Sequence, residues 1–199
     1  MDPGILRARE LAWQLLLMQK PARLPVRVER LSFDKNLIID SLERYCALTG
    51  DTLQRLCAGS GVLRDGCTLI RQRGDQKIYI MLYNEGARSI RRRNFTLAHE
   101  VGHVYLGHEQ DSPLWERQAN AFAAELLAPR ILVAQHLKYL GGCLDPAHAL
   151  AQAFDVSLSM ARLRLNCCTP RANYTVREEE LLSRYKAALP NPNEPEITY

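Results

Sequence analysis

Residues 95–108 read FTLAHEVGHVYLGH, in which His99, Glu100 and His103 stand among apolar and small residues. His99 and His103 are four positions apart, so on a helix they lie on one face, one turn apart. Both imidazoles can then reach a single metal ion, and Zn²⁺ is the ion that this ligand type and spacing favour. Glu100 is about 100° further round the helix, where it can act as a general base on water without occupying a ligand position.

Gly102 stands in the middle of this predicted helix, where glycine costs about 1 kcal/mol relative to alanine. We expect such a cost where something must approach the helix closely. The apolar surroundings favour a buried face that carries a metal site over a chance match on a charged surface helix.

A catalytic zinc site needs a third protein ligand and one open position. His108 stands one position too early for the pattern in which one helix and its turn supply three histidines, so we interpret it as a helix-terminal or substrate-side residue. The alternative is a carboxylate on the next helix, where Glu116, Asn120 and Ala123 share one face. Glu116 would then face the metal, with Asn120 as an outer partner one turn further on.

Among the other acidic residues nearby, Glu125 is a weaker candidate for the third ligand. Glu125 is on a different face of the same predicted helix from Glu116. Glu109 and Asp111 fall in the connecting loop, where we expect them to be solvated.

Strand patterns precede the motif helix, and helical patterns follow it. Residues 67–72 and 77–83 are predicted strands, and in the second Ile78, Ile80 and Leu82 alternate with Tyr79, Met81 and Tyr83. Arg73-Gly74-Asp75 lies between the two, which predicts a β-hairpin. Residues 26–33 favour a short strand, and residues 36–57 fit either helix or loop. Apolar periodicity predicts helices at 5–19, 89–106, 114–127, after Pro129, 146–153, 158–167 and 176–188. The pattern therefore predicts an α+β fold.

Composition bounds the class of protein. The chain has 199 residues, of which 47% are apolar and 24% charged, with a net charge of +4, so it can form a globular core and is not marked as a nucleic-acid binder. None of the six cysteines forms a C-x-x-C pair, which argues against a cysteine zinc ribbon. Without a signal peptide pattern or a membrane-length apolar run, we expect a cytoplasmic protein with reduced, mostly buried thiols, including the adjacent Cys167 and Cys168.

Two spaced motifs, RRNFTLAHEVGHVYLGH at 92–108 and ERQANAFAAELLAP at 116–129, closely resemble the ImmA/IrrE family of metallopeptidases. The resemblance extends over about residues 60–165 and implies a reduced thermolysin-like zincin core. It also implies a specific set of roles. These are zinc ligation by His99, His103 and Glu116, and catalysis by Glu100.

With this resemblance, we expect a zincin-like domain at 1–140, a helical C-terminal extension at 141–188 and a disordered tail at 189–199, whose end reads PNPNEPEITY. The chain departs from the family pattern at Ala128, where many relatives carry methionine, and at Asn94, where arginine is common. Neither position belongs to the metal set, so we expect them to affect substrate contacts only.

In a thermolysin-like core, the strand before the zinc helix forms the rim of the cleft. We therefore predict that the strand at 77–83 is an edge strand whose backbone binds an extended peptide, with Asn84 adding a hydrogen bond. The alternative is an interior strand with both edges paired. For the group that stabilises the oxyanion, Tyr105, Tyr139 and His108 are the candidates.

The family resemblance implies a regulatory endopeptidase that cleaves a transcriptional repressor supplied in trans, often a helix-turn-helix protein of a mobile element or stress circuit. The competing hypothesis is a non-enzymatic, zinc-containing regulator that binds a partner protein or DNA. Glu100 favours catalysis, because a structural zinc site has no use for a carboxylate there.

Two sequence features bear on DNA binding. The arginines at 88, 91, 92 and 93 are interpreted as a solvated face, with steering of an acidic partner as the alternative. LAQAFDVSLSMARLRL, at 150–165, resembles a helix-turn-helix in pattern, but we favour a helical hairpin that completes the core, with Asp155 or Ser157 capping a helix. Direct binding of nucleic acid is therefore not expected, although these features leave it open.

Overall fold

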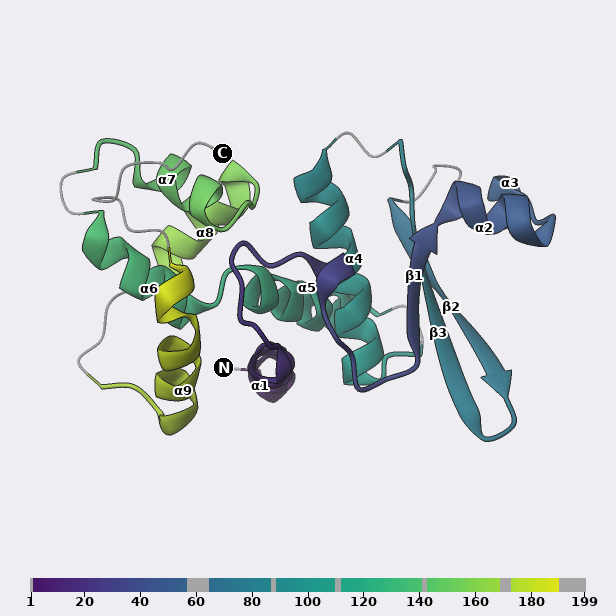
Figure 1. The fold of residues 1–199 in the computed structure, drawn as a ribbon, viewed down its shortest axis with the longest axis horizontal. Helices are drawn as coiled ribbons and strands as arrows, with labels where there is room; N and C mark the ends of the chain where they lie inside the picture. Colours follow the sequence, from purple (N-terminus) through teal and green to yellow (C-terminus); the bar gives the residue numbers. More distant parts are fainter. Residues whose placement is uncertain are drawn as a thin grey trace.

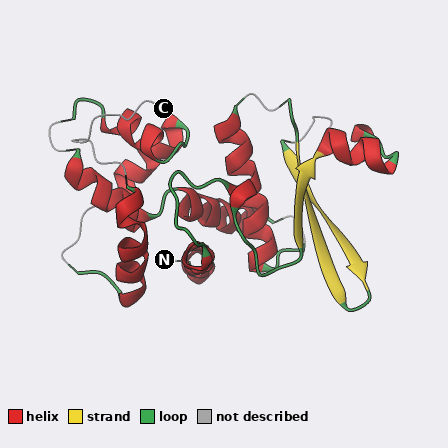
Figure 2. Ribbon diagram, in the orientation of Figure 1, coloured by secondary structure: helices red, strands yellow, loops and turns green. Residues whose placement is uncertain are grey.

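The fold was determined as a computed structural model that describes residues 2–56, 65–86, 89–109, 112–140, 143–168 and 173–189. One face of a small three-stranded sheet packs on a central group of helices. The helices from the C-terminal part of the chain lie on the other side of this central group, away from the sheet (Figures 1 and 2). The predicted α+β class is confirmed, with a reduced zincin core and a helical extension.

The sheet contains β1 (Leu37–Ser41), β2 (Gly66–Arg73) and β3 (Gln76–Tyr83) in the order β1-β3-β2. β1 pairs with β3 in parallel, and β2 pairs with β3 antiparallel from Gly66↔Tyr83 to Arg73↔Gln76. The two strands of this hairpin are joined at Gly74, whose φ of +60° lies in the left-handed region. The predicted hairpin is confirmed.

β3 lies in the interior of the sheet and pairs along both edges, so the prediction that it is an edge strand is wrong. The strand that covers its second edge comes from residues 37–41, a segment whose sequence fitted helix or loop. The strand expected at 26–33 is also wrong, because the structure there has a single 3₁₀ turn, η1 (Val28–Arg30).

Nine α-helices and a second 3₁₀ turn complete the described residues. They are α1 (Pro3–Met18), α2 (Leu42–Thr49), α3 (Leu53–Leu56), α4 (Ile90–Leu106), α5 (Pro113–Leu127), α6 (Arg130–Tyr139), α7 (Pro146–Ala153), α8 (Leu158–Cys167), α9 (Val176–Tyr185) and η2 (Lys186–Ala188). Pro129 precedes α6 as its N-cap. Leu189 is buried in the core, whereas the Pro-rich end, 190–199, lies outside the described residues.

Helix α4 begins and ends where its sequence predicts. The Ser89 hydroxyl accepts a hydrogen bond from the Arg92 N–H at 3.1 Å, which satisfies one of the unpaired donors of the first turn. Gly107 ends the helix in the left-handed conformation, with φ of +73°. These caps fix which residues of α4 face the rest of the molecule.

At Gly102, α4 lies close against α5. A Cβ atom there would lie 3.1 Å from Cβ of Phe122 and 3.2 Å from both Cα and O of Ala119. The sequence predicted that some segment approaches α4 closely at this glycine, and that segment is α5. This contact brings the face of α5 that carries Glu116 and Asn120 to the histidine face of α4.

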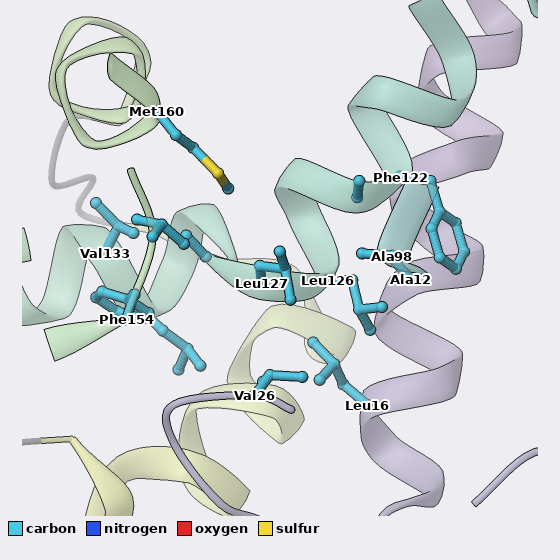
Figure 3. Packing of buried hydrophobic residues seen from close by; sticks show 14 of the residues in the cluster. Ala12, Leu16, Val26, Ala98, Phe122, Leu126, Leu127, Val133, Phe154 and Met160 are labelled. Atoms are coloured by element: carbon cyan, nitrogen blue, oxygen red, sulfur yellow. The ribbon is translucent and has the colours of Figure 1, made fainter. Parts of the chain in front are cut away.

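One hydrophobic core joins the helices on both sides of α5. Figure 3 shows side chains of α1, α4, α5 and α6 packed together with Phe154 and Met160. The core thus includes residues of the expected zincin-like domain and of the helical extension. The division at residue 140 stays a prediction.

Asn94, one of the departures from the family pattern, is buried and has a structural role. Its side-chain amide donates to the Val26 carbonyl at 2.8 Å and accepts from the Val28 N–H at 2.9 Å. These bonds hold the segment around η1 on α4. Ala128 is buried at the end of α5.

The cysteines of the described residues are free thiols, as expected. The expectation that most are buried is wrong, because only Cys168 is buried among these five, and Cys143 and Cys167 are exposed. Cys57 lies outside the described residues. In the part of the chain that the structure describes, every helix is too short or too polar to cross a membrane.

We expect Gly102→Ala to lower the free energy of unfolding by about 1–3 kcal/mol, because the added methyl group would overpack against the α5 backbone. An unhindered glycine-to-alanine change within a helix would instead stabilise it by about 1 kcal/mol. Urea denaturation measures the difference. Ser183→Ala, at an exposed position of α9, is the control, and a Gly102→Ala variant at least as stable as wild type would contradict the close contact.

Candidate metal centre

Three side chains from two helices meet at one point. Nε2 of His99 lies 3.0 Å from Nε2 of His103. The two carboxylate oxygens of Glu116 lie 3.2 Å from these nitrogens, one from each. The structure thus brings together the three residues that were predicted as metal ligands.

The spacing of these atoms fits a metal ion. Two ligand atoms that are each about 2.0–2.1 Å from a tetrahedral zinc lie roughly 3.3 Å apart, close to the separations found here. Nearly half of the Glu116 side chain is exposed, at 47%, whereas His99 and His103 are 15% and 18% exposed. The two histidine side chains are therefore mostly buried, while the glutamate side is open to solvent. An open side is typical of a catalytic rather than a structural zinc site.

Each histidine has an outer partner that fixes its orientation. Nδ1 of His99 lies 3.0 Å from Oδ1 of Asn120, and Nδ1 of His103 lies 3.0 Å from Nδ1 of His108. If Nδ1 of His99 and His103 carries the proton, it can donate to these acceptors, and the lone pair of Nε2 is directed at the shared point. The predicted role of Asn120 agrees with this geometry.

His108 connects His103 to residues further from the metal group. Its Nε2 lies 3.1 Å from Oε1 of Gln118, and its ring stacks on Trp115 with centroids 4.9 Å apart. Burial lowers the pKa of His108, which favours the neutral ring that can accept from His103. Gln118 in turn packs on α1 at Gly4, where a Cβ atom would lie only 1.9 Å from its amide nitrogen.

Glu100 lies beside the ligands and contacts the sheet. The Thr68 hydroxyl of β2 donates a hydrogen bond to Oε2 of Glu100 at 2.5 Å. Both residues line a cavity of about 880 Å³, together with His99, His103 and Glu116. We call it the metal cavity. Tyr79 of β3 also lines it, and β2 contributes four residues along one wall.

A comparison with protein-family models matches residues 68–166 to the IrrE N-terminal-like domain, a domain of peptidases. The chain belongs to the ImmA/IrrE family. No curated protein matches the chain significantly. The family is one of metallopeptidases, so membership implies a divalent metal ion. Among the described residues, His99, His103 and Glu116 form the group of histidine, cysteine and acidic side chains that could hold one.

Glu125, a weaker candidate ligand, does not belong to this group. It is fully buried and accepts hydrogen bonds from Trp13 Nε1 at 2.9 Å, the Arg130 N–H at 2.9 Å and the Arg164 guanidinium at 3.1 Å. It therefore ties α1, α6 and α8 to α5. Glu109 is exposed and pairs with Lys77, as expected for a solvated loop carboxylate. Asp111 lies outside the described residues.

Two of the three oxyanion candidates are engaged elsewhere. The Tyr105 hydroxyl donates to Asp34 at 2.5 Å, and the Tyr139 hydroxyl accepts from Gln135 at 3.1 Å. Neither lines the metal cavity, whereas His108 does. Asn84, expected to contact the peptide, accepts from the Gly86 N–H in a turn and is not part of the cavity wall.

The sequence did not indicate Thr68, Gln118 or the outer role of His108. Thr68 looks like an ordinary strand residue, and only the hairpin register places it opposite Met81, on the α4 side of the sheet. Gln118 is about 200° further round α5 than Glu116, so its spacing from that ligand gave no signal for a role at the site. Its partner depends on the turn that follows α4, which no local pattern specifies.

We expect Asn120→Ala to weaken metal binding by about 10–100-fold, because His99 loses the partner that orients its ring. Competition with a chromophoric chelator measures the affinity. Asn166→Ala, at an exposed position of α8, is the matched control and should bind as wild type does. Equal affinities for the two variants would show that Asn120 does not support the site.

Proposed function

We propose that this chain is a zinc-dependent endopeptidase. The observation that carries the proposal is the convergence of His99, His103 and Glu116 at the wall of an 880 Å³ cavity, with the Glu100 carboxylate beside them. A cavity of this size can hold several residues of a polypeptide. Membership of a metallopeptidase family supports the same reaction class.

In this proposal His99, His103 and Glu116 hold the zinc. When bound, zinc acts as a Lewis acid that polarises a carbonyl group and makes water nucleophilic at neutral pH. Glu100 takes the proton from the attacking water and gives it to the nitrogen of the leaving amine. The hydrogen bond from Thr68 fixes the orientation of the Glu100 carboxylate for both transfers.

The edge strand for substrate binding is β2 rather than β3. Within the described residues, β2 has no strand on the edge opposite β3, and Gly66, Cys67, Thr68 and Ile70 line the metal cavity. An extended peptide can add to such an edge through backbone hydrogen bonds, while alternate side chains provide specificity. We therefore propose that the substrate backbone pairs with β2, and not with β3 as the sequence had suggested.

The proposed substrate is a regulatory protein in the cytoplasm, such as a helix-turn-helix transcriptional repressor supplied in trans. Family resemblance supports this choice. The substrate would present an extended, accessible segment, since a folded domain cannot enter a cavity between a strand and two helices.

Non-enzymatic DNA binding has less support. Each described arginine of the cluster is paired within the chain: Arg91 with Asp155 at 2.6 Å, Arg92 with Asp65 at 2.5 Å, and Arg93 with Glu29 at 3.4 Å. Arg88 lies outside the described residues. Paired charges leave little net field to attract phosphates.

The α7–α8 segment also fits the helical hairpin better than a DNA-reading unit. Leu150, Phe154, Val156 and Met160 pack in the core. Ser157 caps α8, and its hydroxyl accepts from the Met160 N–H at 3.2 Å. On α8, Arg164 is buried against Glu125, so it cannot contact a groove.

The protein should bind about one zinc ion per chain, and His99→Ala should abolish binding. Glu100→Gln should keep the zinc and lower hydrolysis of a protein substrate by roughly 10²–10⁴-fold, because only the proton acceptor is lost. Elemental analysis and a gel-based cleavage assay measure the two effects. Full activity of Glu100→Gln would overturn the mechanism, and zinc binding by His99→Ala would overturn the ligand set.

Thr68→Val should lower kcat by about 10–100-fold, the equivalent of one hydrogen bond to a charged group. Thr68→Ser keeps the hydroxyl and should retain most of the activity. Zinc content should be the same in both variants, which separates the effect on Glu100 from damage to the metal site. If valine and serine variants have the same kcat, Thr68 does not position Glu100.

A further inference from the structure

A second cavity, of about 820 Å³, adjoins the metal cavity. His99 and Gly66 line both cavities, so the two lie next to each other at one of the three metal ligands, His99. The second cavity runs between the first half of α4, the end of α5 and the start of α8. We call it the α8 cavity.

The wall of the α8 cavity that faces α4 comes from the helical extension. Val156 and Met160 line it, and both also pack in the core. Figure 3 shows the Met160 side chain extending from α8 toward Leu127, at the end of α5. Phe95 of α4 and Leu127 complete an apolar floor.

The charged groups at the rim of this cavity are already paired. Arg92 makes two contacts with one oxygen of Asp65, from Nε at 2.8 Å and from the terminal nitrogen at 2.5 Å. Arg91 donates to Asp155 at 2.6 Å. Among the described residues of this rim, a charged substrate side chain would find its possible partners already paired, whereas an apolar one would bury surface against the floor.

The extension is held beside α4 by one carboxylate. Asp155, in the turn between α7 and α8, bridges Arg91 of α4 and Arg27 of the segment before η1. Burial raises the pKa of Asp155, but the hydrogen bond from Arg91 and the charge of Arg27 outweigh this effect, so the pKa is lowered. The bridge keeps Val156 and Met160 at a fixed distance from the metal site.

We propose that the α8 cavity is the specificity subsite of the enzyme, and that it accepts an apolar side chain on one side of the scissile bond, with Met160 setting its size. The inference rests on the proposed function. A peptide whose scissile carbonyl lies at the metal must pass His99, so the residues on its two sides enter the two different cavities. The hairpin that resembles a DNA-binding motif thus serves as a wall of the substrate cleft.

The experiment uses the zinc-loaded full chain and a peptide library made by digesting a denatured bacterial proteome. Cleavage sites are identified by mass spectrometry for wild type, Met160→Phe and Met160→Ala. Wild type should prefer large apolar residues at one position next to the cut. Met160→Phe should shift that position toward alanine and valine, and Met160→Ala should shift it toward the largest side chains, each by about tenfold in relative kcat/KM, a usual size for one or two methylenes.

Leu163→Ala is the control on the same helix, because Leu163 is 62% exposed and is not part of the cavity wall. It should leave the cleavage profile unchanged. Asp155→Asn, which weakens the bridge to Arg27 and Arg91, should broaden the preference at the same position without changing zinc content. Zinc content and circular dichroism of every variant exclude loss of the metal or of the fold as the cause.

Peptide binding to Glu100→Gln, measured by fluorescence anisotropy, separates this inference from the proposed function. If wild type cuts peptides but both Met160 variants keep its profile, the subsite is wrong and the peptidase stands. If wild type cuts nothing, while affinity for peptides with large apolar residues depends on Met160, the subsite stands and the peptidase is wrong. If wild type neither cuts nor binds these peptides, both proposals fail.

Discussion

The contact between α4 and α5 at Gly102 is the constraint on which the rest of the site depends. Without a side chain at this position, α4 meets the backbone of Ala119 in α5 at a distance that a Cβ atom would make too short. The metal site lies beside this contact, since His103 directly follows Gly102 on α4 and Glu116 is about one turn before Ala119 on α5. A shift of α5 by one methyl group would separate the Glu116 carboxylate from His99 and His103, although no ligand had been altered.

Buried and half-buried carboxylates hold the other helices around this pair. Glu125 connects α5 to Trp13, Arg130 and Arg164, from three other segments. Asp155 connects the α7–α8 turn to α4. Removal of one partner from a buried pair costs about 3–5 kcal/mol, because the remaining charge is left uncompensated. Together with the apolar core, these interactions position the wall of the α8 cavity relative to the metal site.

The sequence predicted those features that depend on local spacing. The i, i+4 histidines, the caps of α4 at Ser89 and Gly107, and the bounds of α7 and α8 all follow from residues within a few positions of one another. Glu116 could be predicted because two helices joined by a short loop have few ways to face each other. The motif resemblance then selected it over His108.

Features that depend on distant pairing could not be predicted in this way. β3 is interior because Leu37–Ser41 pairs with it in parallel, and a strand of five residues leaves little periodicity to detect. Glu125 connects α5 to α1 because Trp13, 112 positions away in the sequence, donates a hydrogen bond to its carboxylate. In the same way, each arginine at the start of α4 finds its carboxylate in another segment, so a run that looked like a solvated face is a set of specific ion pairs.

X-ray absorption spectroscopy at the zinc edge of the purified, zinc-loaded protein tests the central claim most directly. The claim is that the contact of α4 with α5 builds a site of two imidazoles and one carboxylate. The account predicts two imidazole ligands at about 2.0–2.1 Å and the remaining positions filled by oxygen at about 2.0–2.2 Å, with no sulfur. A third imidazole, which would have to come from His108 or another histidine, or a zinc–sulfur distance near 2.3 Å would contradict it.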